Sequence, residues 1–211
     1  PTKLDGEIAV FVNTLSADAE TLASAVTVKK GNTILPAELY TVAAGESFAT
    51  DKTFTVTFLP TGNEQEVTIG DALTAVEVGV KANYTQENGY YKEPVSDDGV
   101  AYSAFVAGMT KEQYVPALDV VGVYGSVRVA FTVGGTTPDG KTVSVDLWNL
   151  PANRATITVS AGSVRGTLTV PVEDEKIVKV NAVYNGTKTL YPYDKLTLSD
   201  ITVTLRYNNK R

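Results

Sequence analysis

Three groups of carboxylates are the residues of this sequence whose types and spacing best suit catalysis or cation binding. The groups are Asp97-Asp98, Glu173-Asp174-Glu175, and Asp194 with Asp200. Paired carboxylates are the usual catalytic equipment of glycosidases, and clustered carboxylate oxygens bind Ca²⁺. The sequence has no Asp-x-Asp-x-Asp-Gly calcium loop, however, and too little predicted helix to frame an extended cleft. We therefore interpret these groups as solvated turn charges and predict no metal site. Glu173-Asp174-Glu175 is expected to connect a strand that ends at Val172 to one that begins near Ile177.

Histidine and cysteine, which carry much of enzymatic chemistry, are both absent from the sequence. Histidine is the usual proton shuttle near neutral pH, and cysteine is the usual thiol nucleophile and soft metal ligand. Neither sequence motif of a catalytic serine is present: Ser163 misses the Gly-x-Ser-x-Gly pattern on both sides, and no Ser-x-x-Lys occurs. We predict that the protein is not an enzyme and has no catalytic residues and no cofactor. A carboxylate-driven glycosidase is the catalytic alternative.

A tyrosine-rich segment is the best candidate for a binding surface. Tyr84, Tyr90, Tyr91 and Tyr102 lie within 19 residues, with the turn signal Asn88-Gly89 between them. Tyrosine is enriched at interfaces because its ring is apolar and its hydroxyl is polar. We predict Tyr84, Asn88, Tyr90 and Tyr91 as possible contacts for a protein partner or a surface glycan, with Tyr90 and Tyr91 the most exposed. The alternative is that Tyr84 and Tyr102 end strands and pack at the edge of the core.

Composition and charge restrict the partners and the environment. Hydrophobic residues make up 43% of the chain and charged residues 20%, so a packed core is expected rather than disorder. The net charge of −6 disfavours nucleic acid and anionic membrane surfaces as partners. No stretch reaches the ~18 apolar residues of a membrane span, so we expect no membrane insertion. No signal peptide is visible at Pro1, so either a signal sequence was removed or an initiator methionine was trimmed there.

Alternating polar and apolar residues predict strands along almost the whole chain, which is typical of sandwiches and barrels. The predicted strands are Glu7–Asn13, Ala25–Lys30, Thr53–Leu59, Glu66–Ile69, Ala75–Tyr84, Gly125–Val133, Lys141–Trp148, Ala155–Ser160, Gly166–Val172, Lys176–Tyr184 and Asp200–Tyr207. Helix is scarce. Ser16–Ala25 is a short candidate, and Thr110–Gln113 forms a capping box that Pro116 ends within about one turn.

Ser126–Val133 illustrates the packing that we expect. A period of two places its valines and Phe131 on one face, which should face the core. Lys141–Trp148 is its expected antiparallel partner, joined to it by a long hairpin loop. The lone Trp148, at the end of that second strand, is expected to fill the core.

The C-terminal segment 177–208 carries a family resemblance. It combines the strand Ile177–Val180, the turn Tyr184-Asn185-Gly186, the step Leu190–Leu196 and the β-branched strand Ile201–Leu205. This order resembles the opening of bacterial immunoglobulin-like modules, which occur in surface proteins and phage virion proteins. In that family further strands follow. The resemblance therefore implies that the tail completes a sheet with earlier strands, pairs with a neighbouring molecule, or continues in a further part.

Together, the patterns predict an all-β fold with two immunoglobulin-like or jelly-roll-like antiparallel β-sandwiches and very little helix. The stretch Thr85–Asp98 is polar and turn-rich, which indicates a long loop or a linker. We place the boundary within residues 85–116. This gives an N-terminal β-sandwich domain in residues 1–100 and a C-terminal immunoglobulin-like domain in residues 101–211.

For function, we expect a non-enzymatic structural protein of a virion or extracellular assembly, such as a phage capsid auxiliary or decoration protein or a tail protein. Its partners would be further copies of itself or other structural subunits. The alternative is a cell-surface adhesin, a surface-layer protein or a carbohydrate-binding module. The resemblance and the tyrosine-rich segment favour that alternative. Either function places the protein in a virion, outside the cell or at the cell surface.

Overall fold

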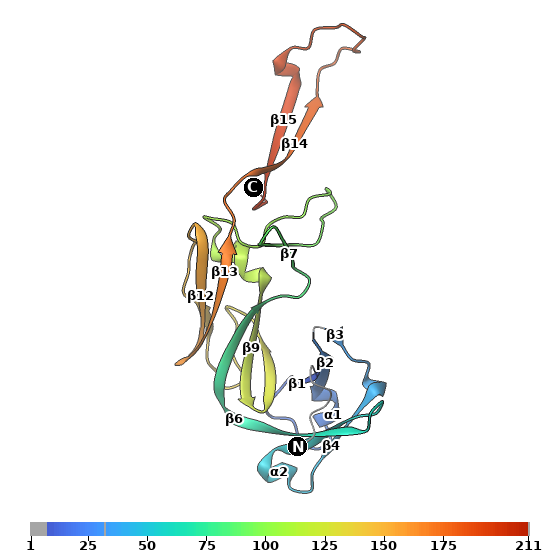
Figure 1. The fold of residues 1–211 in the computed structure, drawn as a ribbon, viewed down its shortest axis with the longest axis vertical. Coiled ribbons are helices and arrows are strands. Elements are labelled where there is room, and N and C mark those ends of the chain that lie inside the picture. Colours follow the sequence, from blue (N-terminus) through green and yellow to red (C-terminus); the bar gives the residue numbers. More distant parts are fainter. Residues whose placement is uncertain (1–7, 32, 211) are drawn as a thin grey trace. The chain divides into compact units, whose positions relative to one another are not determined.

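The protein, described by a computed structural model over residues 8–31 and 33–210, is built mainly of strands (Figure 1). The strands are β1 Ile8–Val12, β2 Val26–Lys30, β3 Thr33–Ile34, β4 Tyr40–Ala44, β5 Thr53–Phe58, β6 Asn63–Val80, β7 Thr85–Glu87, β8 Tyr90–Lys92, β9 Leu118–Gly125, β10 Val127–Phe131, β11 Val143–Val145, β12 Asn153–Ala161, β13 Val164–Val172, β14 Ile177–Tyr184 and β15 Ile201–Tyr207. The helical segments are α1 Leu22–Ala25, α2 Phe48–Asp51, α3 Lys111–Tyr114, and the 3₁₀ turns Ala37–Leu39, Val115–Ala117 and Leu198–Asp200. The all-β prediction is confirmed. Glu7, in the first predicted strand, lies outside the described residues.

The chain folds into two compact units that are interleaved along the sequence. The first unit runs up to Ala82 and also includes Leu118–Leu147 and Thr156–Thr169. The second comprises Asn83–Ala117, Trp148–Ala155 and the chain from Val170 onward. The predicted domains, residues 1–100 and 101–211, follow chain order instead and therefore divide the sequence differently.

An eight-stranded sheet makes up most of the first unit, with the strand order β3-β2-β1-β10-β9-β6-β5-β4. Seven pairings join these strands, and six of them are antiparallel, while β1 and β10 pair in parallel through Phe11 and Arg128. The prediction that Lys141–Trp148 pairs with β10 is wrong, because the two neighbours of β10 in the sheet are β1 and β9. The short β11 pairs with β12 instead, in a three-stranded sheet completed by β13.

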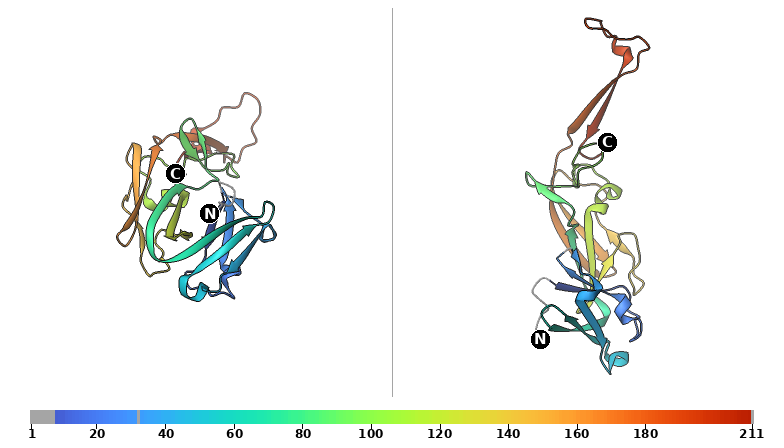
Figure 2. Two further views of the ribbon diagram at one scale, coloured as in Figure 1. Left: turned by 60° about the horizontal axis from the view of Figure 1, so that its bottom comes forward. Right: turned by 90° about the vertical axis from the view of Figure 1, so that its right-hand side faces the viewer.

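Strand β6 is long because two predicted strands merge into one. Its first part pairs with β5, and its second part, from Ile69 onward, pairs with β9 (Figures 1 and 2). The pairing with β9 shifts register near Gly70, where a Cβ atom would lie 2.4 Å from the backbone nitrogen of Gly125. Glycine is therefore required where the two backbones approach each other most closely.

The core of the first unit follows the predicted alternation. Val127 and Val129 of β10 are buried, as expected, whereas Phe131 is half-buried with its ring edge-on to Tyr124. Phe54 and Phe48 form a second edge-to-face pair, with ring centroids 6.3 Å apart, and both are buried. Apolar side chains on one face of each strand are thus removed from water, which is the main favourable term in folding.

The second unit contains the capping box predicted at Thr110. The Thr110 hydroxyl and the Gln113 side chain satisfy each other's backbone N–H groups, and α3 ends at Tyr114, just before Pro116. The expected core position of Trp148 is wrong, because this side chain is 71% exposed. The Lys111 ammonium lies 3.8 Å from the centre of its indole ring. This cation–π contact gives the exposed ring a charged partner at the surface.

Two other predictions were tested by the structure. The connector of three carboxylates begins after Val172 and ends before Ile177, as expected. The helix predicted at Ser16–Ala25 is reduced to the single turn α1, preceded by a turn in which Asp18 accepts hydrogen bonds from Thr21. Among the described residues, no helix is both long and apolar enough to cross a membrane.

Candidate functional site

A buried polar cluster centred on Glu173 is the most unusual site in the second unit. Glu173 follows β13 and is 5% exposed, although we expected it to be a solvated turn charge. Its backbone is fixed on both sides, since its N–H donates to Phe105 and its carbonyl accepts from Ala107. The prediction of a solvated carboxylate is therefore wrong at this position. Burying a carboxylate requires several strong partners nearby.

Backbone contacts between segments far apart in the sequence bring those partners together. Lys92 ends β8 and forms an isolated antiparallel bridge with Ser103. The backbone N–H of Ser103 donates to the carbonyl of Asn208 at 2.9 Å, and the N–H of Asn208 donates to Lys176 at 2.9 Å. These backbone contacts hold an amine, a hydroxyl and a carboxamide around Glu173.

Side-chain contacts inside the cluster converge on one oxygen, Oε2 of Glu173. The Lys92 Nζ atom lies 2.6 Å from this oxygen and 2.6 Å from the Ser103 Oγ atom. The Ser103 hydroxyl and the Asn208 Nδ2 atom also donate to Oε2, the latter at 3.2 Å. Lys92 and Asn208 are 9% and 0% exposed, so the amine and the carboxamide are both shielded from water.

The remaining oxygen and the Asn208 amide are also satisfied. Lys176 reaches in from solvent, with its Nζ 2.5 Å from Oε1 of Glu173. The Asn208 Oδ1 atom accepts the backbone N–H of Lys176 at 3.0 Å, and its Nδ2 also donates to the Asp174 carbonyl at 2.9 Å. Burial alone would raise the pKa of Glu173, but the donors Lys176, Lys92, Ser103 and Asn208 outweigh burial and lower it to about 2.

The predicted tyrosine contacts lie on and next to the β7–β8 hairpin. Asn88 occupies the left-handed region at φ 52°, followed by Gly89 at φ 84°, so the Asn-Gly turn signal gives the expected tight turn. Asn88 is exposed, whereas Tyr84, Tyr90 and Tyr91 are half-buried. The Tyr91 ring packs edge-on against Phe105, at 6.0 Å between centroids. The proposed contact role of these four residues stays a prediction.

A second carboxylate cluster lies in the first unit, around Asp139. The Tyr124 hydroxyl donates to its Oδ1 at 2.6 Å, the Thr137 hydroxyl donates at 2.6 Å, and the Lys141 ammonium lies 2.9 Å from Oδ2. These donors hold the pKa of Asp139 well below its usual range. Burial, and then the bond to Asp139, raise the pKa of Tyr124 to about 12. The hydroxyl therefore stays neutral and serves as a structural donor.

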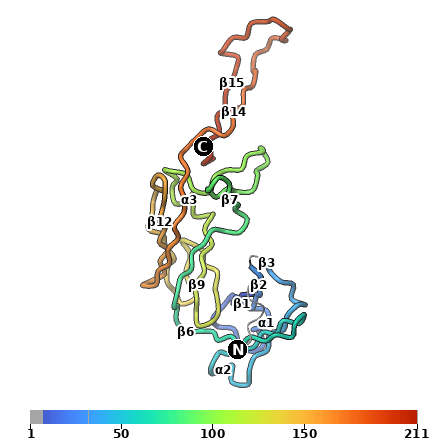
Figure 3. The backbone as a smooth tube through the Cα atoms, in the orientation of Figure 1, coloured from blue at the N-terminus to red at the C-terminus, as the bar shows by residue number. Residues whose placement is uncertain are grey.

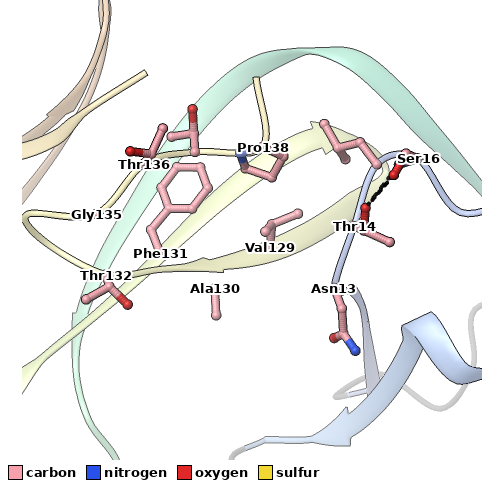
Figure 4. A pocket seen from close by; sticks show the side chains of 12 residues that line it. Asn13, Thr14, Ser16, Val129, Ala130, Phe131, Thr132, Gly135, Thr136 and Pro138 are labelled. Atoms are coloured by element: carbon pink, nitrogen blue, oxygen red, sulfur yellow. Dashed lines mark hydrogen bonds between the residues drawn. The ribbon is translucent and has the colours of Figure 1, made fainter. Parts of the chain in front are cut away.

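A hollow in the first unit lies beside β10 and has a volume of about 600 Å³. Figure 4 shows the Phe131 ring directed into it below Thr136 and Pro138, with Thr14 and Ser16 hydrogen-bonded at its rim. Its lining residues bear apolar, hydroxyl and amide groups but no acid or base. The hollow thus offers no group that could transfer a proton at neutral pH.

The β14–β15 hairpin presents an exposed apolar surface. Its two strands form a separate two-stranded sheet, joined by the long loop visible in Figure 3. Cross-strand partners share a face, so one face carries three apolar pairs and the other carries mostly polar ones. The apolar pairs, here called the hairpin apolar face, are Val180–Leu205, Ala182–Val203 and Tyr184–Ile201. Val180 and Val203 are 60% and 56% exposed.

The opposite, polar face of the hairpin borders a small hollow of about 360 Å³. Asp98, Lys179, Asn181, Thr204 and Arg206 line it. Hydrogen bonds from Ser96 and Tyr102, outweighing desolvation, lower the pKa of Asp98 to about 2. The Lys179 ammonium donates to the backbone carbonyl of Asp98 at this hollow.

Comparison with known proteins finds no relative of this chain. The chain matches no protein-family model, no curated protein and no solved structure. Within residues 8–31 and 33–210, no group of three or more acidic side chains is arranged to hold a metal ion. The geometry therefore identifies a buried cluster, an aromatic hairpin and an exposed apolar face as the candidate functional features.

Proposed function

We propose that the protein is a non-enzymatic structural subunit of a virion or extracellular assembly, such as a phage capsid auxiliary or decoration protein or a tail protein. The hairpin apolar face is the observation that carries this proposal. A two-stranded sheet is marginally stable by itself in water, and soluble monomers rarely expose a contiguous apolar surface of this kind. An assembly that covers this face accounts for its composition.

A second copy of the same chain is the proposed occupant of the hairpin apolar face. Residues 177–211 contain six lysines and arginines but two acidic residues, which gives them a net charge of +4. Since the whole chain carries −6, residues 1–176 carry −10. A basic hairpin of one copy is therefore attracted to the acidic remainder of another. Such a contact uses two different surfaces and builds rings or open filaments.

Light scattering over a concentration series tests self-assembly directly. We expect the mass in solution to rise with protein concentration and to fall with added salt, because salt screens the charge complementarity. Val203→Asp should abolish the rise. Thr204→Asp is the matched control, since it adds the same charge on the opposite face of β15 and should leave association nearly unchanged.

A monomeric wild-type protein at every concentration and at low salt would contradict the assembly proposal. Equal loss of association in both aspartate variants would show that the added charge matters and not the apolar face. Circular dichroism of each variant confirms that the remaining sheets are folded.

The second candidate function is an adhesin, surface-layer or carbohydrate-binding module. The β7–β8 hairpin supports it, because it places Asn88 in solvent beside two half-buried tyrosines. A glycan array tests this candidate, with Tyr90→Ala expected to reduce any signal at least tenfold. Tyr40→Ala, which changes a half-buried tyrosine of the first unit, is the matched control.

A further inference from the structure

The Glu173 cluster holds an amine and a carboxamide against the same carboxylate oxygen. Lys92 Nζ and Asn208 Nδ2 lie 2.6 Å and 3.2 Å from Oε2 of Glu173. A buried ion pair needs one cation for one carboxylate, and Lys176 already pairs with the other oxygen. Lys92 is therefore a second cation at this carboxylate, and Asn208 places a neutral carboxamide beside it.

The groups around Asn208 meet the requirements for attack of an amine on its side-chain carbonyl. The nucleophile must lose a proton, and Oε2 lies within hydrogen-bond reach of Lys92 Nζ to take it. The carbonyl must be polarised, and its oxygen accepts a backbone N–H from Lys176 at 3.0 Å. The leaving nitrogen must gain a proton, and that nitrogen already contacts the same Oε2.

We propose that Lys92 and Asn208 form an intramolecular amide bond, with Glu173 relaying the proton. A bond forms between Lys92 Nζ and Asn208 Cγ, and the bond between Cγ and Nδ2 breaks. The Lys92 nitrogen loses two protons, one before it attacks and one after the new bond has formed, and Glu173 relays both to the departing nitrogen, which leaves as ammonium. Glu173 therefore begins and ends as a carboxylate. The reactants are an ammonium and a primary carboxamide, and the products are a secondary amide and ammonium ion. No oxidant, metal or cofactor is consumed.

Two neighbouring residues position the reacting groups without reacting themselves. Ser103 contacts both Lys92 Nζ and Glu173 Oε2 and so orients the amine. Lys176 holds Oε1 of Glu173, and its own backbone N–H holds Oδ1 of Asn208. Burial excludes water, which would otherwise compete with the amine for the activated carbonyl.

Mass spectrometry of the full-length wild-type protein tests the cross-link. We expect the intact mass to be lower than that of the sequence by about 17 Da, the mass of one ammonia. Trypsin should release a branched peptide that joins residues 82–111 to residues 207–210, because a modified Lys92 is not cleaved. Fragmentation of this peptide should place the branch at Asn208 rather than Asn209.

Peptide mapping is essential because asparagine followed by glycine can also lose ammonia. Asn88-Gly89 and Asn185-Gly186 are such sites in this chain. A mass loss located there, or free peptides 82–92 and 207–210 from the folded wild-type protein, would overturn the proposal. A purely structural ion pair predicts those free peptides and the full mass.

Matched variants separate the proposed roles. Lys92→Arg keeps the charge but lacks the nucleophile, and Glu173→Gln keeps the shape but lacks the base, so both should show the full mass. Asn209→Ala should still lose one ammonia, since Asn209 takes no part in the bond change. Each variant is accepted only if its circular dichroism matches that of the wild type. The wild-type result decides the proposal even if a variant fails to fold.

Discussion

The eight-stranded sheet and the β14–β15 sheet have the same alternating pattern but opposite exposure. In the large sheet, Val28 and Val56 are completely buried. In the small sheet, Val180 and Val203 remain more than half exposed. The comparison teaches that alternation determines which face of a strand is apolar, whereas packing against another layer determines whether that face leaves water.

The contrast also separates two sources of stability. Side chains that are buried within the chain contribute about 1.5–3 kcal/mol each to folding of the monomer. The side chains of the hairpin apolar face contribute little until another surface covers them. Their contribution then becomes part of the free energy of association.

Truncating Phe54 is the strongest test of this contrast. Phe54→Ala removes a buried ring and its edge-on contact with Phe48, so we expect a loss of about 3–5 kcal/mol in the free energy of unfolding. Val203→Ala in the exposed face should cost less than about 0.5 kcal/mol under conditions where the protein is monomeric. Urea denaturation measures both. A cost above about 2 kcal/mol for Val203→Ala would mean that the hairpin face is covered within the chain.

The Asp139 cluster contributes hydrogen bonds to the stability of the first unit, and the hairpin apolar face has no such contribution. Hydrogen bonds keep the pKa of Asp139 lower in the folded protein than in the unfolded chain. This group therefore stabilises the fold above the unfolded pKa of about 4, and its contribution is lost as the pH falls below that value. Asp139→Asn should cost about 1–3 kcal/mol at pH 7.

The cost of Asp139→Asn should shrink steadily between about pH 5 and pH 2 in thermal melts, as expected for a carboxylate with a lowered folded-state pKa. Val203→Ala, measured in parallel, should show no such trend, because it changes no titratable group. A pH-independent cost of Asp139→Asn would show that the carboxylate charge contributes nothing.

Removing a single hydroxyl is expected to have the smallest effect. Tyr124→Phe deletes the donor to Asp139 but keeps the ring contact with Phe131, so the expected cost is about 1 kcal/mol. A double-mutant cycle with Asp139→Asn should recover most of this value as coupling energy. Additive effects of the two changes would contradict a direct hydrogen bond.

Much of the strand pattern could be predicted, but β9 was missed for a physical reason. Leu118–Gly125 is flanked by β6 and β10 and has buried residues on both faces, so it reads as a nearly continuous apolar run. A search for a period of two does not detect such a strand. The parallel pairing of β1 with β10 was equally hidden, because it depends on contacts far apart in the sequence.

The same distinction between local patterns and contacts far apart in the sequence applies to the candidate sites. The Asn88-Gly89 turn is a local signal, and the sequence predicts it correctly. The cluster of Lys92, Glu173 and Asn208 has no local signature, because three distant segments supply its members. Trp148 was misplaced for a related reason, since its partner Lys111 comes from a separate segment. Local chemistry was thus predictable, whereas chemistry assembled by topology was not.

The interleaved chain path has a consequence for synthesis on the ribosome. Strand β1 cannot pair with β10 until residue 131 has emerged, and β13 does not leave the ribosome before residue 172. At roughly 5–20 residues per second, the N-terminal strands wait for several seconds with their edges unpaired. Nascent chains of this protein are therefore expected to depend on a holding chaperone until β10 has emerged, and the large sheet is expected to close only then.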